Sequence, residues 1–95
     1  MREFIADLPR YIIDRIEPKD GALKSVHETM LGRECQIITL ENGRSGVFLV
    51  DVGDDVFGPH RIVLSYILDV EGEADLSIHT ENTVYSLRRI DFKGD

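Results

Sequence analysis

The chain has 95 residues, of which 42% are hydrophobic and 31% charged, and its 11 basic and 18 acidic residues give a formal net charge of −7. This length accommodates one domain with a single core and leaves no room for a catalytic domain beside a separate regulatory one. The negative charge argues against a protein that binds by neutralising nucleic-acid phosphates or anionic lipid headgroups.

The cysteine content and the apolar runs indicate a cellular location. Cys35 is the single cysteine, so no internal disulfide can form, which fits a reducing compartment. Positions 1–7 contain acidic residues among the apolar ones. A secretory signal instead has an uninterrupted apolar region, so this segment is not typical of one. The longest near-apolar run, 62–68, is far shorter than the roughly 20 residues that a transmembrane helix requires. We therefore expect a soluble, cytoplasmic protein with no membrane partner.

The first 16 residues predict a helix, because their apolar residues recur at steps of three or four. With Asp7 as the N-cap and Pro9 in the first turn, this helix would run from residue 7 to about residue 16. The apolar residues that define its stripe are Ile5, Leu8, Ile12 and Ile16.

The segment 22–31 admits two interpretations. Its apolar residues lie at helical spacing, and Gly32 stands where a helix commonly ends with a left-handed glycine. The alternation of residues 24–29 would also suit an edge strand. We favour the helix and keep the strand as the alternative.

After Gly32 the pattern changes to short β-rich segments separated by turn signals. Asn42-Gly43 predicts a tight type I′ hairpin, since both central residues of that turn take positive φ. The segment 61–70 is long enough to bend or to serve two sheet faces. Glu81-Asn82 would form the last hairpin turn. Five strands are expected, at residues 35–40, 46–52, 61–70, 76–80 and 83–92.

These elements predict an α+β, mostly β fold within one domain of residues 1–95. Residues 1–31 would form a segment with one or two helices. Residues 34–92 would form a small, bent, five-stranded antiparallel sheet, as a meander or an SH3-like barrel. The N-terminal helix would cover one face or one open end, and closure of the barrel would protect its edge strands.

No residues combine into a recognisable catalytic or metal-binding motif. His27-Glu28 begins like a zinc-protease helix, but Leu31 stands where the second histidine ligand would be, so a surface pair is expected. Cys35 follows Glu34, whose charge raises a thiol pKa and opposes nucleophilic attack. We expect a protein that is not an enzyme, that uses no cofactor and that holds no metal.

Acidic residues gather in two predicted turns. Alternation along a strand would place several of them on one face as a negative rim. This rim would be solvated loop charge, a surface for a basic protein partner, or a site for a divalent cation. The expected interaction residues are Asp54, Asp55, Phe57, Tyr66, Glu71, Glu73 and Tyr85, although each aromatic side chain equally fits the core.

The layout of residues 31–90 resembles an Sm-like barrel in its order of a helix, the segment 32–35, the turn 41–44 and a bent strand. That resemblance implies a ring that binds single-stranded RNA, for which Arg61, Arg88 and Arg89 would supply the contacts. The Asp-x-Met-Asn turn of that family corresponds to residues 54–57, which lack asparagine, and its Arg-Gly corresponds to His79-Thr80. No family is assigned on this pattern.

Our leading hypothesis is a non-enzymatic, acidic protein-interaction or regulatory module that binds a basic protein partner or forms a homo-oligomer. The first alternative is an Sm-like nucleic-acid-binding barrel, and the second is a divalent-cation-binding domain. The small size and the composition are typical of phage-borne and accessory bacterial modules.

Overall fold

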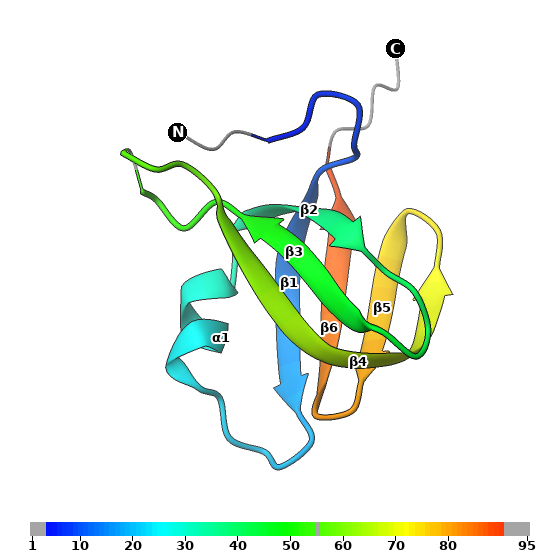
Figure 1. Cartoon of the computed structure of the whole chain (residues 1–95). Helices are drawn as coiled ribbons and strands as arrows, with labels where there is room; N and C mark the ends of the chain where they lie inside the picture. The colour runs from blue at the N-terminus through cyan, green and yellow to red at the C-terminus, as the bar shows by residue number, and fades with distance from the viewer. Residues whose placement is uncertain (1–3, 55, 91–95) are drawn as a thin grey trace.

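Six antiparallel strands close into a barrel in the computed structural model, which describes residues 4–54 and 56–90 (Figure 1). Neighbouring strands in the barrel are neighbours in the chain, and the first strand also pairs with the last. The elements in chain order are β1 (Tyr11–Pro18), α1 (Ser25–Met30), β2 (Glu34–Thr39), β3 (Ser45–Val50), β4 (His60–Gly72), β5 (Asp75–Thr80) and β6 (Thr83–Arg89). No helix among the described residues is long and apolar enough to cross a membrane.

The mostly β character and the small barrel expected from the sequence are confirmed, but the predicted helix at residues 7–16 is wrong. Residues 11–18 form β1, which raises the strand count from five to six. A bulge between Ile13 and Arg15 breaks the two-residue alternation of this strand. Its buried residues Tyr11, Ile13 and Ile16 therefore follow at steps of two and three, which resembles the spacing of a helix.

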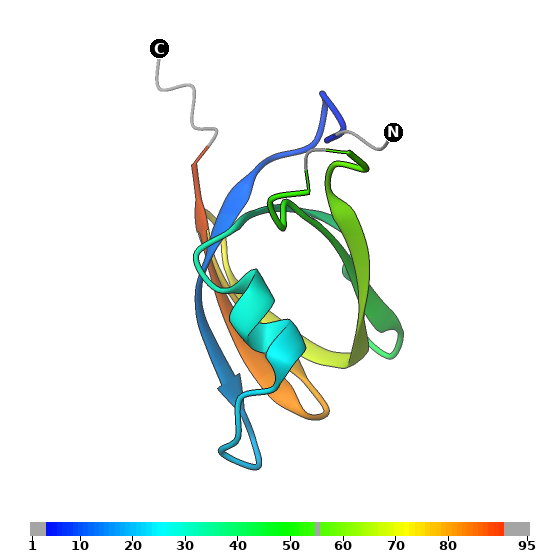
Figure 2. The ribbon, with the colours of Figure 1, turned by 90° about the vertical axis from the view of Figure 1, so that its left-hand side faces the viewer.

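The favoured helix in segment 22–31 is confirmed for residues 25–30. It ends before Gly32, whose φ of 75° is the left-handed conformation expected after a helix. His27 and Met30 are its buried residues, and Met30 belongs to the barrel core. Figure 2 shows α1 lying between the β1–β6 side of the barrel and β4. The helix thus covers part of the barrel, although it precedes β2 and not β1.

The predicted type I′ turn at Asn42-Gly43 is also wrong. Gly43 has a φ of 84°, but no non-glycine residue that the structure describes has positive φ, so Asn42 does not meet the requirement of that turn. The loop bonds to β4 instead. The Gly43 N–H donates to the Ile67 carbonyl at 2.8 Å, and the Ile67 N–H donates to the Arg44 carbonyl at 2.8 Å.

The long strand β4, which was expected to bend or to serve two sheet faces, pairs with different neighbours along its two halves. Its first half pairs with β3, from Val50↔His60 to Ser45↔Tyr66, and its second half pairs with β5 from Ile67 onward. The hairpin between β5 and β6 also forms where Glu81-Asn82 indicated. The part of the expected last strand beyond residue 90 lies outside the described residues.

The core fills the barrel with inward-facing residues from every strand. Phe48 is fully buried and meets Tyr85 edge to face, with ring centroids 5.7 Å apart. Burial of one large apolar side chain contributes about 1.5–3 kcal/mol, so these residues dominate the stability of a domain this small. The buried cluster consists of Tyr11, Ile13, Ile16, Met30, Cys35, Phe48, Val50, Leu64, Ile67, Ile78, Tyr85 and Leu87.

A buried amide attaches the segment before β1 to the barrel wall. Gln36 of β2 is fully buried, and its Oε1 accepts from the Ile5 N–H at 2.7 Å. Its Nε2 donates to the carbonyls of Ile5 at 2.6 Å and Leu8 at 3.1 Å. One side chain therefore bonds three backbone groups of this segment, of which the Ile5 carbonyl also accepts from the Leu8 N–H at 3.2 Å.

We predict that Gln36→Met, which keeps the side-chain length but removes the amide, releases this segment. The Ile5 amide should lose protection from hydrogen exchange, while the amides of β3 and β6 keep theirs. The free energy of unfolding should fall by about 1–3 kcal/mol, because backbone groups near the barrel lose their partners. Exchange measured by NMR and urea titration test this, and an Ile5 amide protected as in the wild type would contradict it.

Candidate functional site

The loop between β3 and β4 is organised by one carboxylate. Oδ1 of Asp54 accepts from the N–H groups of Val56 at 2.9 Å and Phe57 at 3.0 Å. Oδ2 of Asp54 lies 2.8 Å from Nε2 of His60, the first residue of β4. The Gly58 N–H donates to the Asp54 carbonyl at 2.9 Å. The side chain of Asp54 thus stabilises the conformation of the loop. Because its oxygens already have partners within the loop, it is less available as a contact for another protein.

The same turn holds two large apolar side chains in solvent. Val56 is 67% exposed and Phe57 is 66% exposed. Their backbone N–H groups are fixed by Asp54, so the loop cannot easily rearrange to bury them. A fixed aromatic side chain in solvent loses little conformational freedom when a partner covers it. We name residues 54–58 the Phe57 loop; Asp55 of this loop lies outside the described residues.

The pKa of Asp54 is lowered by the hydrogen bond from the Phe57 N–H, and further by His60 and by the Val56 N–H. All three interactions favour the ionised carboxylate. The conformation of the Phe57 loop therefore depends on the ionisation of the Asp54 carboxylate, which is lost at low pH.

A second exposed apolar region lies on the outer face of β4, beyond the Phe57 loop. Val63, Tyr66 and Leu68 are each more than half exposed, with Tyr66 at 53%. Register places Val47 opposite Val63 and Ser45 opposite Tyr66 on β3. Tyr66 was expected to be an interaction residue, which requires an exposed side chain. Its side chain is exposed and is therefore available for contact.

The other expected interaction residues are dispersed. Tyr85 is only 5% exposed and packs in the core, so it is not available for a surface contact. Glu71 and Glu73 are exposed at the turn from β4 to β5, and Glu71 Oε1 lies 3.2 Å from His79 Nε2. Because β4 spans 13 residues, this turn and the Phe57 loop lie at its opposite ends. The acidic residues therefore form two separate groups and not one continuous rim, and the two turns cannot supply ligands to one cation.

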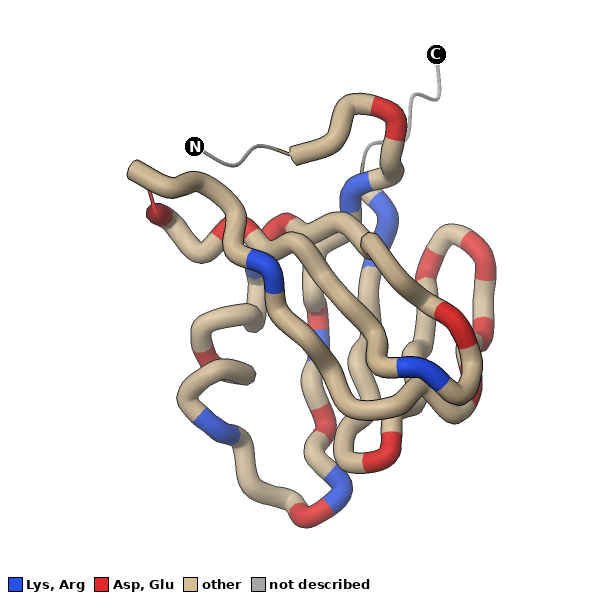
Figure 3. Tube along the Cα trace, viewed as in Figure 1, with Lys and Arg blue, Asp and Glu red and all other residues tan. Residues whose placement is uncertain are grey.

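The arginines of the nucleic-acid hypothesis do not form a continuous basic surface. Arg88 is bound to Asp14 on β1, with 3.0 Å between Nε and Oδ2 and 3.4 Å between Nη2 and Oδ1. Arg61 lies on β4 opposite Leu49, whereas Arg89 lies on β6. Figure 3 shows basic positions grouped near the start of β1 and the end of β6, and elsewhere interspersed with acidic ones. The three arginines therefore lie on two separate strands, and Arg88 is paired with a carboxylate.

Cys35 and His27, the residues that bear on a catalytic or metal site, are both buried. Cys35 is fully buried, and burial together with Glu34 raises the pKa of its thiol to about 12, so it stays protonated and inert. His27 is buried as well, which corrects the expectation of a surface pair. Among residues 4–54 and 56–90, no three His, Cys, Asp or Glu side chains group in a way that would hold a metal ion.

No protein-family model, curated protein or solved structure matches the chain. The candidate site is accordingly defined by geometry alone. It comprises the Phe57 loop and the exposed apolar residues of β4 that follow it.

We predict that acid opens the Phe57 loop. The folded-state pKa of Asp54 lies below its ordinary value of about 3.9, so its contribution to stability is full above that value. This contribution is lost as the pH falls below about 3.9 and through the folded-state pKa, because the proton displaces the bonds to Val56 and Phe57. The protection of these two amides, measured against the exchange rate of an unprotected amide at the same pH, should then fall before the barrel unfolds.

Asp54→Ala should produce the open loop already at neutral pH, with fast exchange at Val56 and Phe57 and unchanged β5 and β6 amides. Asp51→Ala is the matched control, since Asp51 accepts only from the Gly53 N–H in this region. NMR exchange rates from pH 2.5 to 6 provide the measurement. Equal loop exchange in Asp54→Ala and the wild type at pH 6 would refute the role of Asp54.

Proposed function

We propose that this protein is a non-enzymatic interaction module that binds a basic partner protein through the Phe57 loop. The observation that carries the proposal is the combination at one loop of exposed apolar side chains and a backbone fixed by Asp54. Interface hot spots are typically such rigid aromatic anchors, which enter a pocket on the partner. The loop would supply this anchor.

The charge of the loop supports a basic partner. Residues 51–60 contain three aspartates and neither lysine nor arginine, within a chain whose net charge is −7. Asp51 and Asp54 lie in the loop that presents Phe57, so a partner with a basic rim around an apolar pocket would complement both features. A second copy of this chain would place two sets of aspartates together, which disfavours self-association at this loop.

The outer face of β4 extends the proposed contact surface. Tyr66 and Val63 follow the Phe57 loop on the same strand, and each is more than half exposed. A standard interface needs about 800 Å² on each partner, which is more than one loop provides. The exposed β4 residues would therefore add to the contact area that the loop supplies.

The test compares two apolar-to-serine variants. Phe57→Ser removes the anchor, and Leu23→Ser is the control, because Leu23 is also an exposed apolar residue but lies before α1. Each immobilised protein is incubated with nuclease-treated extract of the source organism, and the captured proteins are quantified by mass spectrometry. We expect a basic protein whose capture falls at least about tenfold in Phe57→Ser, as for a hot spot, and is unchanged in Leu23→Ser.

The purified partner must then bind with an association rate that falls as salt rises, because opposite charges accelerate the encounter. Equal capture by Phe57→Ser and wild type would overturn the proposal. A partner that is captured from a parallel extract without nuclease, but not from the nuclease-treated extract, would also overturn it. A wild-type dimer in solution that Phe57→Ser dissociates would also overturn it, because the occupant would then be a second copy. Thermal melting of both variants excludes unfolding as the cause.

A further inference from the structure

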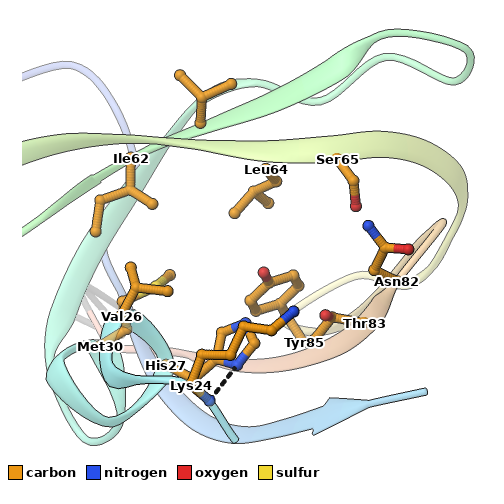
Figure 4. Close-up of a pocket in the computed structure, with 11 residues that line it drawn as sticks. Lys24, Val26, His27, Met30, Ile62, Leu64, Ser65, Asn82, Thr83 and Tyr85 are labelled. Atoms are coloured by element: carbon orange, nitrogen blue, oxygen red, sulfur yellow. Dashed lines mark hydrogen bonds between the residues drawn. The ribbon is translucent and has the colours of Figure 1, made fainter. Parts of the chain in front are cut away.

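A pocket of about 170 Å³ opens between α1, β4 and β6, away from the Phe57 loop (Figure 4). It lies where the helix meets the inner side of the barrel wall. Its lining residues come from positions far apart in the chain and are Lys24, Val26, His27, Met30, Ile62, Val63, Leu64, Ser65, Asn82, Thr83 and Tyr85. An apolar cavity of about 150 Å³ holds a benzene molecule, so this volume suits a compound of about 6–9 non-hydrogen atoms.

The pocket has an apolar end and a polar end. Val26 and Met30 of α1 and Ile62 and Leu64 of β4 form the apolar end (Figure 4). This end is firm, because Met30 is fully buried and Leu64 belongs to the core. It favours a short hydrocarbon or aromatic group.

The polar end contains one cation and several hydrogen-bonding groups. Figure 4 shows the Lys24 ammonium group, the Thr83 hydroxyl and the Tyr85 hydroxyl facing the same space, with Ser65 and Asn82 facing each other beside them. Thr83 is held rigidly, because its N–H donates to Thr80 Oγ1 at 3.1 Å and its carbonyl accepts from that hydroxyl at 2.8 Å. These groups converge from the residue before α1, from β4, from the β5–β6 turn and from β6, where the side chains of Thr83 and Tyr85 are hydrogen-bonded to each other.

The charge in this pocket is opposite to that of the whole molecule. The chain carries a net charge of −7, yet the lining includes Lys24 and neither aspartate nor glutamate. His27 adds no positive charge near neutral pH. Its burial and the nearby Lys24 lower its pKa, against the smaller opposite effect of Asp20. Its Nδ1 accepts the Lys24 backbone N–H at 3.2 Å, a role that requires an unprotonated nitrogen.

We propose that this pocket is a binding site for a small monocarboxylate with a short apolar group. The carboxylate binds the Lys24 ammonium and the Thr83 hydroxyl, and the apolar group packs between Val26, Met30 and Leu64. One lysine balances one negative charge, whereas a phosphate dianion would leave a charge unpaired at a partly apolar site. This site lies apart from the Phe57 loop, although Val63 of the proposed β4 contact surface also lines it. The proposal does not depend on the protein interaction.

The test uses hexanoate as the probe, with two compounds that each lack one of its features. Hexan-1-ol keeps the chain without the charge, and acetate keeps the charge without the chain. Amide chemical shifts of the full-length protein are followed by NMR during titration to 20 mM at constant ionic strength. Hexanoate should cause saturable shifts at residues 24–30, 62–65 and 82–85, with a Kd at least about fivefold lower than that of either control compound.

Two substitutions locate the site. Lys24→Met keeps the stem and removes the charge, and Lys19→Met makes the same change at an exposed lysine outside the pocket. Lys24→Met should weaken hexanoate binding at least about fivefold, and Lys19→Met should leave it within twofold. Val26→Phe fills the apolar end from a half-exposed helix position and should abolish binding without lowering Tm.

Several results would overturn the proposal. These are the absence of saturable shifts up to 20 mM, equal binding of hexan-1-ol, equal binding of acetate, and equal weakening by Lys24→Met and Lys19→Met. Retained hexanoate binding in a folded Val26→Phe protein would also overturn it, because the probe would then occupy another place. The spectra themselves report whether each variant is folded.

Discussion

The pairing of β1 with β6 is the constraint on which the rest of the structure depends. It joins the two ends of the described chain, from Tyr11↔Arg89 to Pro18↔Thr83. Closure leaves no edge strand open to unwanted pairing, so contacts with other molecules fall to loops and side chains. This pairing also brings β6 close to α1. His27 of α1 contacts Tyr85 of β6, with ring centroids 6.2 Å apart. The position of the helix, and of the pocket beneath it, follows from that closure.

Regular strands could be predicted from the sequence, and the bulged strand β1 could not. The order of β2 to β6 follows turn signals such as Glu81-Asn82, together with β-rich runs between them. In β1 the bulge after Ile13 gives the buried residues an irregular spacing, which periodicity cannot distinguish from a helix. The type I′ turn expected at Asn42-Gly43 does not form, for another reason. Its loop bonds to Ile67 of β4, a tertiary contact that overrides the local preference for a tight hairpin.

The candidate surface was partly predictable because its signals are local. Phe57 stands in a loop between glycines and beside aspartates, which already indicated an exposed aromatic residue. The role of Asp54 follows from the tendency of aspartate to bond N–H groups two and three residues later. Tyr85 shows the limit of this reasoning, since only the barrel reveals that it faces the core. The pocket had no local signal, because Lys24, Ser65 and Thr83 come together only through the fold.

One strand links the two regions to which we assign contacts. β4 begins at His60, whose ring binds Asp54 of the Phe57 loop, and its residues 62–65 form one wall of the pocket. Both stretches of the strand are bonded to β3, and Leu64 belongs to the core, so the two regions share a rigid frame. Their local charges differ in sign, with aspartates in the loop and Lys24 in the pocket. A basic protein and a small carboxylate therefore need different groups on this molecule, and neither would neutralise the charge that attracts the other.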